Sequence, residues 1–534
     1  MSWYLLAAEV DKIQDFIFRS SRLREVVGGS QLLSRFCEEV PCGLLPAGAK
    51  VVVNAGGTFR ILFSDAAQAE TFGDQLAEVY HRATGCSLTV AKPVPVGDPI
   101  DEHFPRASEK TQEDLRWTKL QGHGWLSQDH LPYMAVCASC GVGLAVAHRA
   151  YVEDEKAQYV CRSCLNKSTE RQIGRMGTFL EDFYKEVADG QDVTEFDWPG
   201  SQRKRRQSDA LEDVAGFDPR HHVAYLLADG NAMGEVFGSC RSCEQMAKLS
   251  KELMVVVRKA LAVPTRRISQ NGFVPVLPLI LGGDDLFALV PAPWALDFAR
   301  CFCEAYEEKM TDLFEDVGLA GVVPRPTVSC AVVICKSKYP YALAHRTGEM
   351  RLTDAKRIGK LLSERGDSRS TVNFEVLKGG QAAHDLASPT VRATLRPYWV
   401  TDMDLSAWGL PVQRLIDQRW QLRAVPKKRL SELQNLYGET SLPASWDHDK
   451  LIPWQDGLER LLQRIAQRSE AYDKAIRSAL TMLGEDEEKK EGGFWRRVER
   501  DSGEIWHGHG LPDLFELWDF SLELAKSPRD YGEE

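Results

Sequence analysis

The stretch Leu281-Gly282-Gly283-Asp284-Asp285-Leu286 joins two apolar runs, 275–281 and 286–290. The runs predict two antiparallel strands, and the pair of glycines predicts the tight turn between them. Two adjacent aspartates at the tip of such a hairpin are costly, because like charges repel each other where water is excluded. A hard divalent cation relieves that repulsion, so the stretch predicts a site for Mg²⁺ or Mn²⁺.

A third carboxylate follows an earlier apolar run, 223–228, which ends at Asp229 and Gly230. The expected elements around the hairpin are a strand at 223–228, a helix at about 242–261, strands at 275–281 and 286–290, a helix at about 294–315 and a strand at 326–334. This βαββαβ order is ferredoxin-like, and it makes the first strand a neighbour of the hairpin. We therefore expect Asp229, Asp284 and Asp285 to converge and to hold two metal ions, which could bind a triphosphate and activate a 3′-hydroxyl.

The glycines of the expected site have their own role, because backbone without a Cβ can approach a ligand closely. On this basis Gly230, Gly282 and Gly283 are expected to lie against the nucleotide. The alternative interpretation is a plain β-hairpin whose turn happens to read Gly-Gly-Asp-Asp.

An internal repeat favours the site over that alternative. Tyr4-Leu5-Leu6-Ala7 recurs as Tyr225-Leu226-Leu227-Ala228, and Gly56-Gly57 aligns with Gly282-Gly283. The first strand and the glycine pair lie 49 residues apart in the first copy and 54 apart in the second. Two copies of one domain are therefore predicted.

The first copy differs where the chemistry would occur. Its expected strands are 3–8, 51–53, 59–63 and 86–92, with helical patterns over about 13–40 and 65–83. After the matching first strands Ala8 replaces Asp229, and after the matching glycine pairs Thr58-Phe59 replaces the two hairpin aspartates. We expect this copy to be catalytically silent and to pack face to face with the second, although Glu9 and Asp11 leave residual ligation open.

Four cysteines between the copies have the spacing of a zinc ribbon. They form two Cys-x-x-Cys pairs, Cys137/Cys140 and Cys161/Cys164. Each pair could supply two corners of a tetrahedral Zn²⁺ site, and four protein ligands would make that site structural. Free thiols are the alternative.

Composition limits the remaining classes. The 534 residues carry 66 Lys+Arg against 77 Asp+Glu, a net charge of −11, which argues against a protein that coats nucleic acid with a basic surface. No apolar run reaches about 18 residues, and the N-terminus lacks the pattern of a signal peptide, so no membrane contact is expected. Thirteen cysteines, an odd number, favour a reducing cytoplasm.

Several of these motifs resemble a known family. The Gly282-Gly283-Asp284-Asp285 hairpin and Ala355-Lys356-Arg357-Ile358-Gly359-Lys360 resemble the palm of GGDEF-type diguanylate cyclases. The closer resemblance is to the large polymerase-like subunit of type III CRISPR effector complexes, through the stretches 10–18, 23–30 and 228–234. That family also carries a cysteine-pair zinc module between two palms and a C-terminal helical domain.

The resemblance implies a function. In the family the second palm converts ATP into cyclic oligoadenylates when the complex binds target RNA, so the implied partners are other subunits of the ribonucleoprotein, guide RNA and target RNA. Asp229, Asp284 and Asp285 would be metal ligands and Lys356 a phosphate contact, while the first palm would help hold a second nucleotide. Many members begin with an HD nuclease domain. This chain starts at the first palm strand, so no DNase activity is expected, and His384-Asp385 and His448-Asp449 are interpreted as ordinary loop or surface residues.

The predicted fold class is α+β, with two ferredoxin-like palms, a zinc-ribbon insertion and a C-terminal α-helical domain. The expected domains are the first palm (1–110), the zinc module and a helix (111–190), a linker (191–220), the second palm (221–400) and the helical domain (401–534). Two other functions stay open: an idle scaffold subunit of a ribonucleoprotein, or a stand-alone cyclic-nucleotide synthase outside a standard CRISPR complex.

Overall fold

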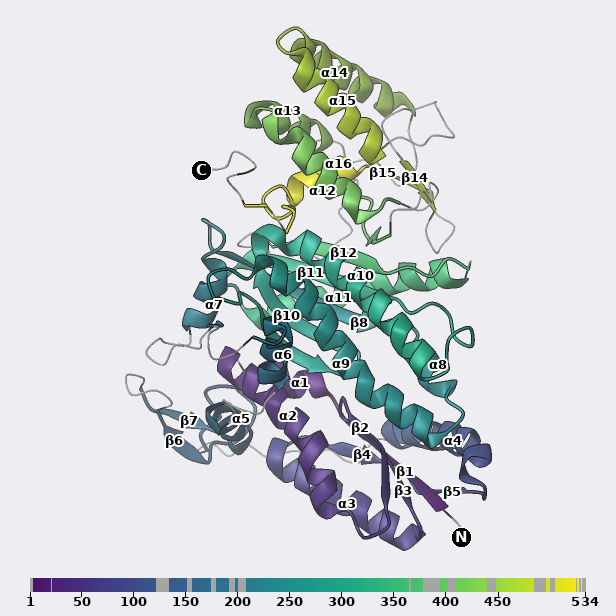
Figure 1. Ribbon diagram of the computed structural model, residues 1–534. Helices are drawn as coiled ribbons and strands as arrows, with labels where there is room; N and C mark the ends of the chain where they lie inside the picture. The colour runs from purple at the N-terminus through teal and green to yellow at the C-terminus, as the bar shows by residue number, and fades with distance from the viewer. Residues whose placement is uncertain are drawn as a thin grey trace.

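The computed structural model describes most of the chain (Figure 1). The described residues are 3–20, 22–121, 134–150, 156–173, 179–191, 197–199, 208–364, 366–377, 394–401, 409–438, 448–484, 496–499, 505–524, 526–527 and 530. The chain runs from a small sheet at the bottom of Figure 1, through a larger sheet in the middle, to a helical part at the top.

The first sheet has the ferredoxin-like order β2-β3-β1-β4. Its elements are β1 (Trp3–Val10), α2 (Leu23–Leu44), β2 (Lys50–Ala55), β3 (Thr58–Phe63), α3 (Ala66–Thr84) and β4 (Leu88–Val90), with β5 (Val94–Val96) added beside β1. The predicted βαββαβ order is confirmed here. The helix expected over 13–40 is instead two helices, α1 (Ile13–Phe18) and α2, because Ser20 turns the chain: its hydroxyl accepts from the Arg22 amide and donates to Glu25.

The second sheet has the order β13-β12-β11-β8-β10-β9, so the same ferredoxin-like core carries two added strands. Its elements are β8 (His222–Gly230), α8 (Met233–Gly238), α9 (Cys243–Ile268), β9 (Leu277–Gly282), β10 (Asp285–Pro291), α10 (Ala295–Asp316), β11 (Val328–Lys336), α11 (Tyr341–Glu364), β12 (Thr371–Val376) and β13 (Tyr398–Trp399). The two-palm α+β prediction is thus confirmed.

The two sheets share a hydrophobic core through β8, which is buried on both faces. Ala224, Leu226 and Ala228 face the core of the second palm. Tyr225 and Leu227, on the opposite face, join a core that includes residues of the first palm. Because side chains alternate along a strand, this central strand packs against helices of its own palm on one side, and against both α11 and residues of the first palm on the other.

The remaining elements flank the palms (Figure 1). They are α4 (Ile100–Gln121), the hairpin β6 (Ala147–Arg149) and β7 (Gln158–Val160), α5 (Arg162–Ile173), α6 (Phe179–Ala188), α7 (Ser208–Ala215), and the C-terminal α12 (Val412–Gln421), α13 (Lys427–Gly438), α14 (His448–Ala466), α15 (Glu470–Gly484), β14 (Arg496–Glu499), β15 (Ile505–Gly508) and α16 (Gly510–Glu516). The domain boundaries stay predictions, and the one at 110/111 falls inside α4. Within the described part of the chain, no helix is long and apolar enough to span a membrane.

A buried ion cluster fastens the C-terminal part to the second palm. Arg396 lies 2.8 Å from Glu516, 3.3 Å from Asp513 and 3.5 Å from Glu375, and its side chain is 8% exposed. Tyr398 also donates to Asp513, at 2.7 Å. One buried guanidinium is therefore the shared counter-ion of three carboxylates.

We expect Arg396→Met to destabilise the fold by about 3–5 kcal/mol, because it leaves buried carboxylates without their counter-ion. Urea unfolding would measure the loss. The control is Arg35→Met, which removes a more exposed i,i+4 pair with Glu39 and should cost under about 1 kcal/mol. Equal losses for the two variants would contradict the importance given to the cluster.

Candidate functional site

The Gly-Gly-Asp-Asp hairpin has the tight geometry that the sequence predicts. Gly282 pairs with Asp285, so the turn consists of Gly283 and Asp284 alone. Gly283 has φ +64°, a conformation that favours glycine at the first turn position. The turn holds Asp284 at the tip of the hairpin.

The end of β8 lies against this tip. A Cβ atom added to Gly230 would lie 3.2 Å from the Asp284 Cβ and 2.7 Å from the Tyr306 hydroxyl oxygen. A glycine is therefore needed at position 230 for close packing between the strand end and the hairpin. The structure brings Asp229, Gly230 and Asp284 together, as predicted.

Lys356 also reaches this place. It lies on α11, and its ammonium forms an ion pair with Asp229 Oδ2. The side chains of Asp229 and Lys356 are 23% and 39% exposed, so solvent reaches the pair. The predicted phosphate contact is thus beside the carboxylates, paired with one of them.

Burial and the repulsion between neighbouring carboxylates raise the pKa values of the aspartates at the hairpin. The pKa of Asp284 is raised to about 7, first because the surrounding protein removes its hydration and then because of the Asp229 charge. The pKa of Asp285 is raised in the same direction, by desolvation first and then by the Asp284 and Asp229 charges, although water still reaches this exposed residue. The charged form of Asp284 is therefore disfavoured, which is the condition that a bound cation would reverse.

The three aspartates are not equivalent, contrary to the simple convergence expected. Asp284 shares a side-chain hydrogen bond with Asp229, whereas Asp285 begins β10 and is exposed. Consecutive side chains near a strand point to different sides. Among the described residues, only the four cysteines form a group of three or more ligand atoms that all lie within 4.8 Å of one another.

A fourth carboxylate, Glu349, lies close by and was missed from the sequence. It stands seven residues before Lys356 on α11, which places both on one face of the helix. Its charge contributes to the raised pKa of Asp285, and its own pKa is raised by burial and by Asp229. The i,i+7 spacing from Lys356 is the signal that could have revealed it.

The strand registers correct the sequence alignment of the two palms by one residue. Ala8 lies opposite Phe59 in the first palm, as Ala228 lies opposite Leu286 in the second. Glu9, rather than Ala8, therefore occupies the place of Asp229. The alignment was wrong because it matched Tyr4-Leu5-Leu6-Ala7 with Tyr225-Leu226-Leu227-Ala228 by residue type, without the strand register.

The hairpins follow the same corrected register. Gly56 and Gly57 form the first turn, so Gly57 and Thr58 replace Asp284 and Asp285. The first palm therefore lacks hairpin carboxylates, as predicted, but retains one carboxylate at its strand end. Glu9 is paired with Lys119 of α4 at 2.8 Å.

The two glycine turns face each other across the palms. A Cβ atom added to Gly56 would lie 3.7 Å from both Cα and N of Gly283. The predicted face-to-face packing is therefore what the structure shows at this point. It places the first palm's turn directly beside the candidate site.

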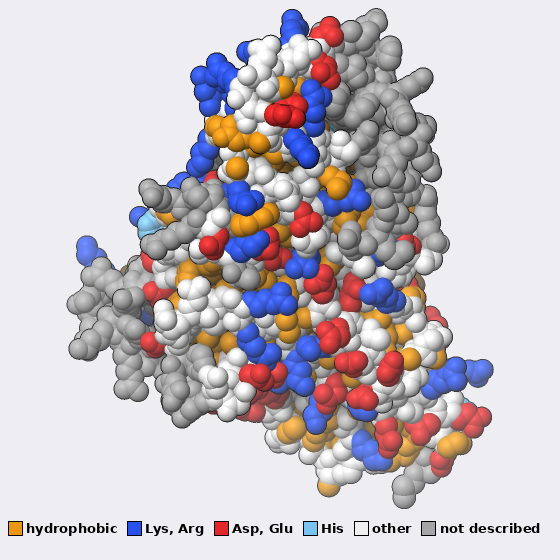
Figure 2. Space-filling model, turned by 45° about the horizontal axis from the view of Figure 1, so that its top comes forward, with side chains coloured by type: hydrophobic (Ala, Val, Ile, Leu, Met, Phe, Trp, Pro, Cys, Tyr) orange, Lys and Arg blue, Asp and Glu red, His pale blue; other side chains and the backbone are white. Residues whose placement is uncertain are grey.

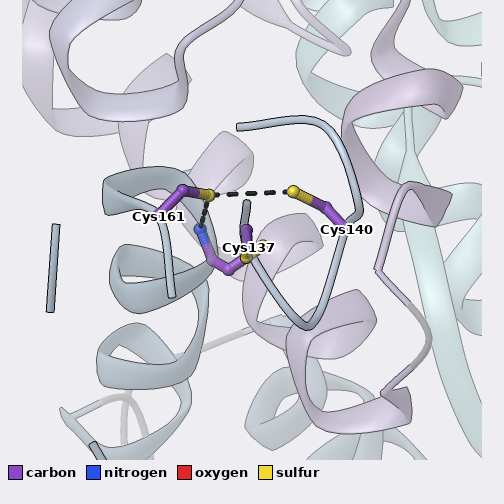
Figure 3. Close-up of side chains that lie close together, drawn as sticks. Cys137, Cys140 and Cys161 are labelled. Carbon is purple, nitrogen blue, oxygen red and sulfur yellow. Dashed lines mark hydrogen bonds between the residues drawn. The ribbon is translucent and has the colours of Figure 1, made fainter. Parts of the chain in front are cut away.

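The four cysteines come together into one cluster, and Figure 3 labels three of them, Cys137, Cys140 and Cys161. All four sulfurs lie within 4.8 Å of one another, and the Cys140 and Cys161 sulfurs are 3.8 Å apart. Metal–sulfur bonds of about 2.3 Å arranged tetrahedrally require sulfurs roughly 3.8 Å apart. The Gly143 amide donates to Cys140 Sγ at 3.4 Å, and the Cys164 amide donates to Cys161 Sγ at 3.5 Å, contacts that suit thiolates.

The cluster is joined to the first palm by buried polar contacts. Ser139, inside the first Cys-x-x-Cys pair, donates to Glu25 of α2 at 3.0 Å, and Ser168 of α5 donates to the same carboxylate at 3.3 Å. Lys167, 1% exposed, donates to the Phe16 carbonyl of α1. The cysteine module is therefore packed onto the helices that enter the palm interface.

Other candidate residues lie elsewhere. His384-Asp385 falls outside the described residues, and at His448-Asp449 the structure describes the backbone of α14 but no side chains. Cys240, which forms a further Cys-x-x-Cys pair with Cys243 in the sequence, is buried in the core of the second palm, and among the residues described it belongs to no group of three or more ligand atoms.

The raised pKa of Asp284 predicts a pH-dependent stability. The pKa of Asp284 is about 7 in the folded protein and 3.8 ordinarily, so the folded state holds its proton more tightly than the unfolded state. The contribution of Asp284 to the free energy of unfolding is therefore most favourable below pH 4 and is lost as the pH rises through 7. Asp284→Asn should therefore stabilise the protein at pH 8, by of the order of 1 kcal/mol after allowance for solvent screening. Thermal unfolding at pH 4.5 and pH 8 would measure it, and a gain that does not shrink at the lower pH would contradict the assignment.

The fold and site together define a ferredoxin-like palm, with carboxylates at a strand end and at a neighbouring hairpin. Comparison of the sequence with protein families agrees: residues 222–361 match the family model described as Cas10/Cmr2, second palm domain. The predicted resemblance to the large type III CRISPR subunit is confirmed for these residues, so the second palm is Cas10-like. No curated protein matches the sequence.

Solved structures were also compared. A Csm1–Csm4 cassette in complex with AMPPNP matches with 17% identity and a TM-score of 0.42, covering 69% of this chain and 54% of that one. A Csm1–Csm4 cassette in complex with cA4 matches with 16% identity and a TM-score of 0.39, covering 71% of this chain and 56% of that one. Csm1 in T. onnurineus matches with 14% identity and a TM-score of 0.49, covering 98% of this chain and 70% of that one. The chain thus spans little more than half of the matched cassette chains.

Proposed function

We propose that this chain is the polymerase-like subunit of a type III CRISPR-type antiviral complex, and that its second palm converts ATP into cyclic oligoadenylates. The observation that carries the proposal is the meeting of Asp229, Asp284 and Lys356 at the Gly-Gly-Asp-Asp hairpin, inside the segment that matches the Cas10/Cmr2 palm. Partner subunits, guide RNA and target RNA would complete the assembly, in the reducing cytoplasm that the cysteine usage predicts.

The residues divide the work by their chemistry. Asp229 and Asp284 would hold Mg²⁺ or Mn²⁺, with Asp285 as an outer ligand at the exposed edge. The metals would supply an activated 3′-hydroxyl and neutralise charge at the attacked α-phosphate as pyrophosphate leaves. Lys356 would hold the triphosphate as a point charge, and Gly230, Gly282 and Gly283 would let backbone lie against the nucleotide.

The first palm would shape the other side of the nucleotide pocket. Its turn at Gly56 faces Gly283, and its Glu9 is paired with Lys119. With Gly57 and Thr58 at the places of the two hairpin aspartates, it would bind a second nucleotide without catalysing the reaction.

The cysteine cluster would hold a structural Zn²⁺. All four ligands come from the protein, so no position stays open for a substrate. Through Ser139, Ser168 and Lys167 the metal would fix α1 and α2 of the first palm.

RNA recognition would depend on the assembled complex. The chain has a net charge of −11, and Figure 2 shows Lys and Arg interspersed with Asp and Glu over the palms. A surface of mixed sign does not attract the phosphate backbone as a broad basic surface does. The RNA would therefore act on this chain chiefly through its partner subunits.

The test is synthesis from ATP by the assembled complex. The complex would be incubated with each NTP and Mg²⁺ or Mn²⁺, with and without target RNA, and the products identified by mass spectrometry. Cyclic or linear 3′–5′ oligoadenylates that require the divalent ion are expected. Unchanged ATP under all conditions, with the complex shown to bind target RNA, would contradict the proposal.

A further inference from the structure

Buried polar side chains behind the candidate site link the end of β8 to β11. Asn231 follows Asp229 by two residues. Its side-chain amide donates to the Thr327 hydroxyl at 3.0 Å and accepts from the Ser329 hydroxyl at 2.9 Å. Ser329 lies opposite Asp229 in the antiparallel register of β8 and β11, and it is fully buried. The hydrogen bonds therefore begin at the strand end that carries Asp229.

The hydrogen bonds continue through β12 to the backbone of α11. The hydroxyl oxygens of Ser329 and Thr371 are 3.1 Å apart, and the Thr371 hydroxyl donates to the Ala355 carbonyl at 3.0 Å. Ala355 directly precedes Lys356, whose ammonium pairs with Asp229. The contacts thus form a closed circuit. It runs from the end of β8 through three side chains to the turn of α11 that carries Lys356, and the ion pair returns it to Asp229.

The helix lies close to this circuit because Gly359 has no side chain. A Cβ atom added to Gly359 would lie 3.4 Å from Asn231 Nδ2 and 3.6 Å from Ser329 Oγ, so there is room for no more than a methyl group. One turn earlier in the helix, the Arg351 carbonyl accepts from Asn373 Nδ2 of β12 at 3.0 Å. Two side chains of β12 therefore hold successive turns of α11 by directed bonds to its backbone.

Directed bonds of this kind fix a helix more closely than apolar contact does. A buried hydroxyl or amide that loses its partner still carries the cost of its desolvation, so each group of the circuit is held in its place. Apolar burial is non-directional and permits a helix to shift while it stays buried. The lysine side chain is long and flexible, so the point that its ammonium reaches depends on where the backbone of its turn is held.

We propose that Thr371 is a positioning residue for Lys356. Its hydroxyl holds the helical turn in the place from which the lysine ammonium meets Asp229, and it would keep the ammonium there when a triphosphate binds. The strand that carries Asp229 and the helix that carries the phosphate contact are thereby fixed as one unit. The proposal rests on the proposed role of Lys356 as a phosphate contact.

Binding of AMPPNP, a non-hydrolysable ATP analogue, tests this role without turnover. Equilibrium dialysis with Mg²⁺ would measure its affinity for the assembled complex. Thr371→Val keeps the shape of the side chain and removes the hydroxyl. It should weaken binding about fivefold, because the turn that carries Lys356 loses its bond to β12. Thr371→Ser, which restores the hydroxyl, should bind within about twofold of the wild type.

A double-mutant cycle separates positioning from a general loss of structure. In a Lys356→Met background the phosphate contact is already absent, so Thr371→Val should change the affinity for AMPPNP less than about twofold. An equal loss in both backgrounds would overturn the proposal, as would no loss in either.

The matched control is Thr265→Val in α9 of the same palm. Thr265 is fully buried and its hydroxyl donates to the Leu261 carbonyl at 2.7 Å, so the same substitution removes a comparable bond away from the site and should leave the affinity unchanged. If Thr371→Val does not fold, Ser329→Ala breaks the circuit at its middle. That variant should weaken binding about twofold, with the same dependence on Lys356.

A failure of the proposed function would give a different result. A wild-type complex that does not bind AMPPNP, or binding that Asp284→Asn leaves unchanged, would contradict the nucleotide site itself rather than the role of Thr371.

Discussion

The double substitution Asp284→Asn/Asp285→Asn should reduce oligoadenylate synthesis by at least about a hundredfold, because both metal-facing charges at the hairpin are lost. Folding should survive and even improve at neutral pH, since desolvation and the Asp229 charge raise the pKa of Asp284 to about 7 and disfavour its charged form in the folded protein. Product formation from ATP by the assembled complex, measured beside thermal unfolding, would show the two opposite changes.

A control variant separates this effect from a general loss of negative charge. Asp312→Asn/Glu315→Gln removes two exposed carboxylates from α10 in the same palm and should leave synthesis unchanged. If the hairpin variant, with wild-type activity confirmed alongside, made products at the normal rate, the second palm would not be the catalytic centre. A scaffold role would then account better for the chain.

Cys161→Ser should cause the largest loss of stability. Structural Zn²⁺ contributes about 10–16 kcal/mol in small zinc peptides at neutral pH, and the cluster here joins the module to Glu25 and Phe16 through Ser139 and Lys167. Hydrogen exchange should rise first in β6, β7, α5 and α1, and the variant should purify with much less than one zinc per chain.

Cys86→Ser is the matched control, because Cys86 is a free, half-buried cysteine outside the cluster. It should keep its zinc and its exchange pattern. Zinc-free wild-type protein, purified without chelator and with normal protection of α1, would contradict the structural role of the metal.

Much of the fold could be predicted because hydrophobic periodicity and turn residues are local signals. The order of strands and helices in both palms followed from apolar runs, and the glycine pairs marked where the two hairpins turn. The break between α1 and α2 was missed because the apolar spacing continues across it. A side-chain contact between Ser20 and Glu25 reverses the chain there, and periodicity does not report such contacts.

The residues of the candidate site that belong to a sequence motif could be predicted. The residue that reaches the site through packing between distant elements was missed. Asp229, Asp284 and Lys356 could be named because strand ends and a known motif point to them. Glu349 depends on the docking of α1 against α11, a contact between residues 335 positions apart. The equivalence of Glu9 and Asp229 depends on strand register, and the match of similar residues in the two first strands was shifted by one position.

The central claim is that this hairpin assembles a two-metal nucleotide site. The EPR spectrum of Mn²⁺ bound to the protein with a non-hydrolysable ATP analogue tests it most directly, because two ions about 4 Å apart give an exchange-coupled signal. The account predicts that coupled signal for the wild type and its loss in Asp284→Asn/Asp285→Asn. Spectra of isolated Mn²⁺ alone, or a coupled signal that survives the double substitution, would contradict it.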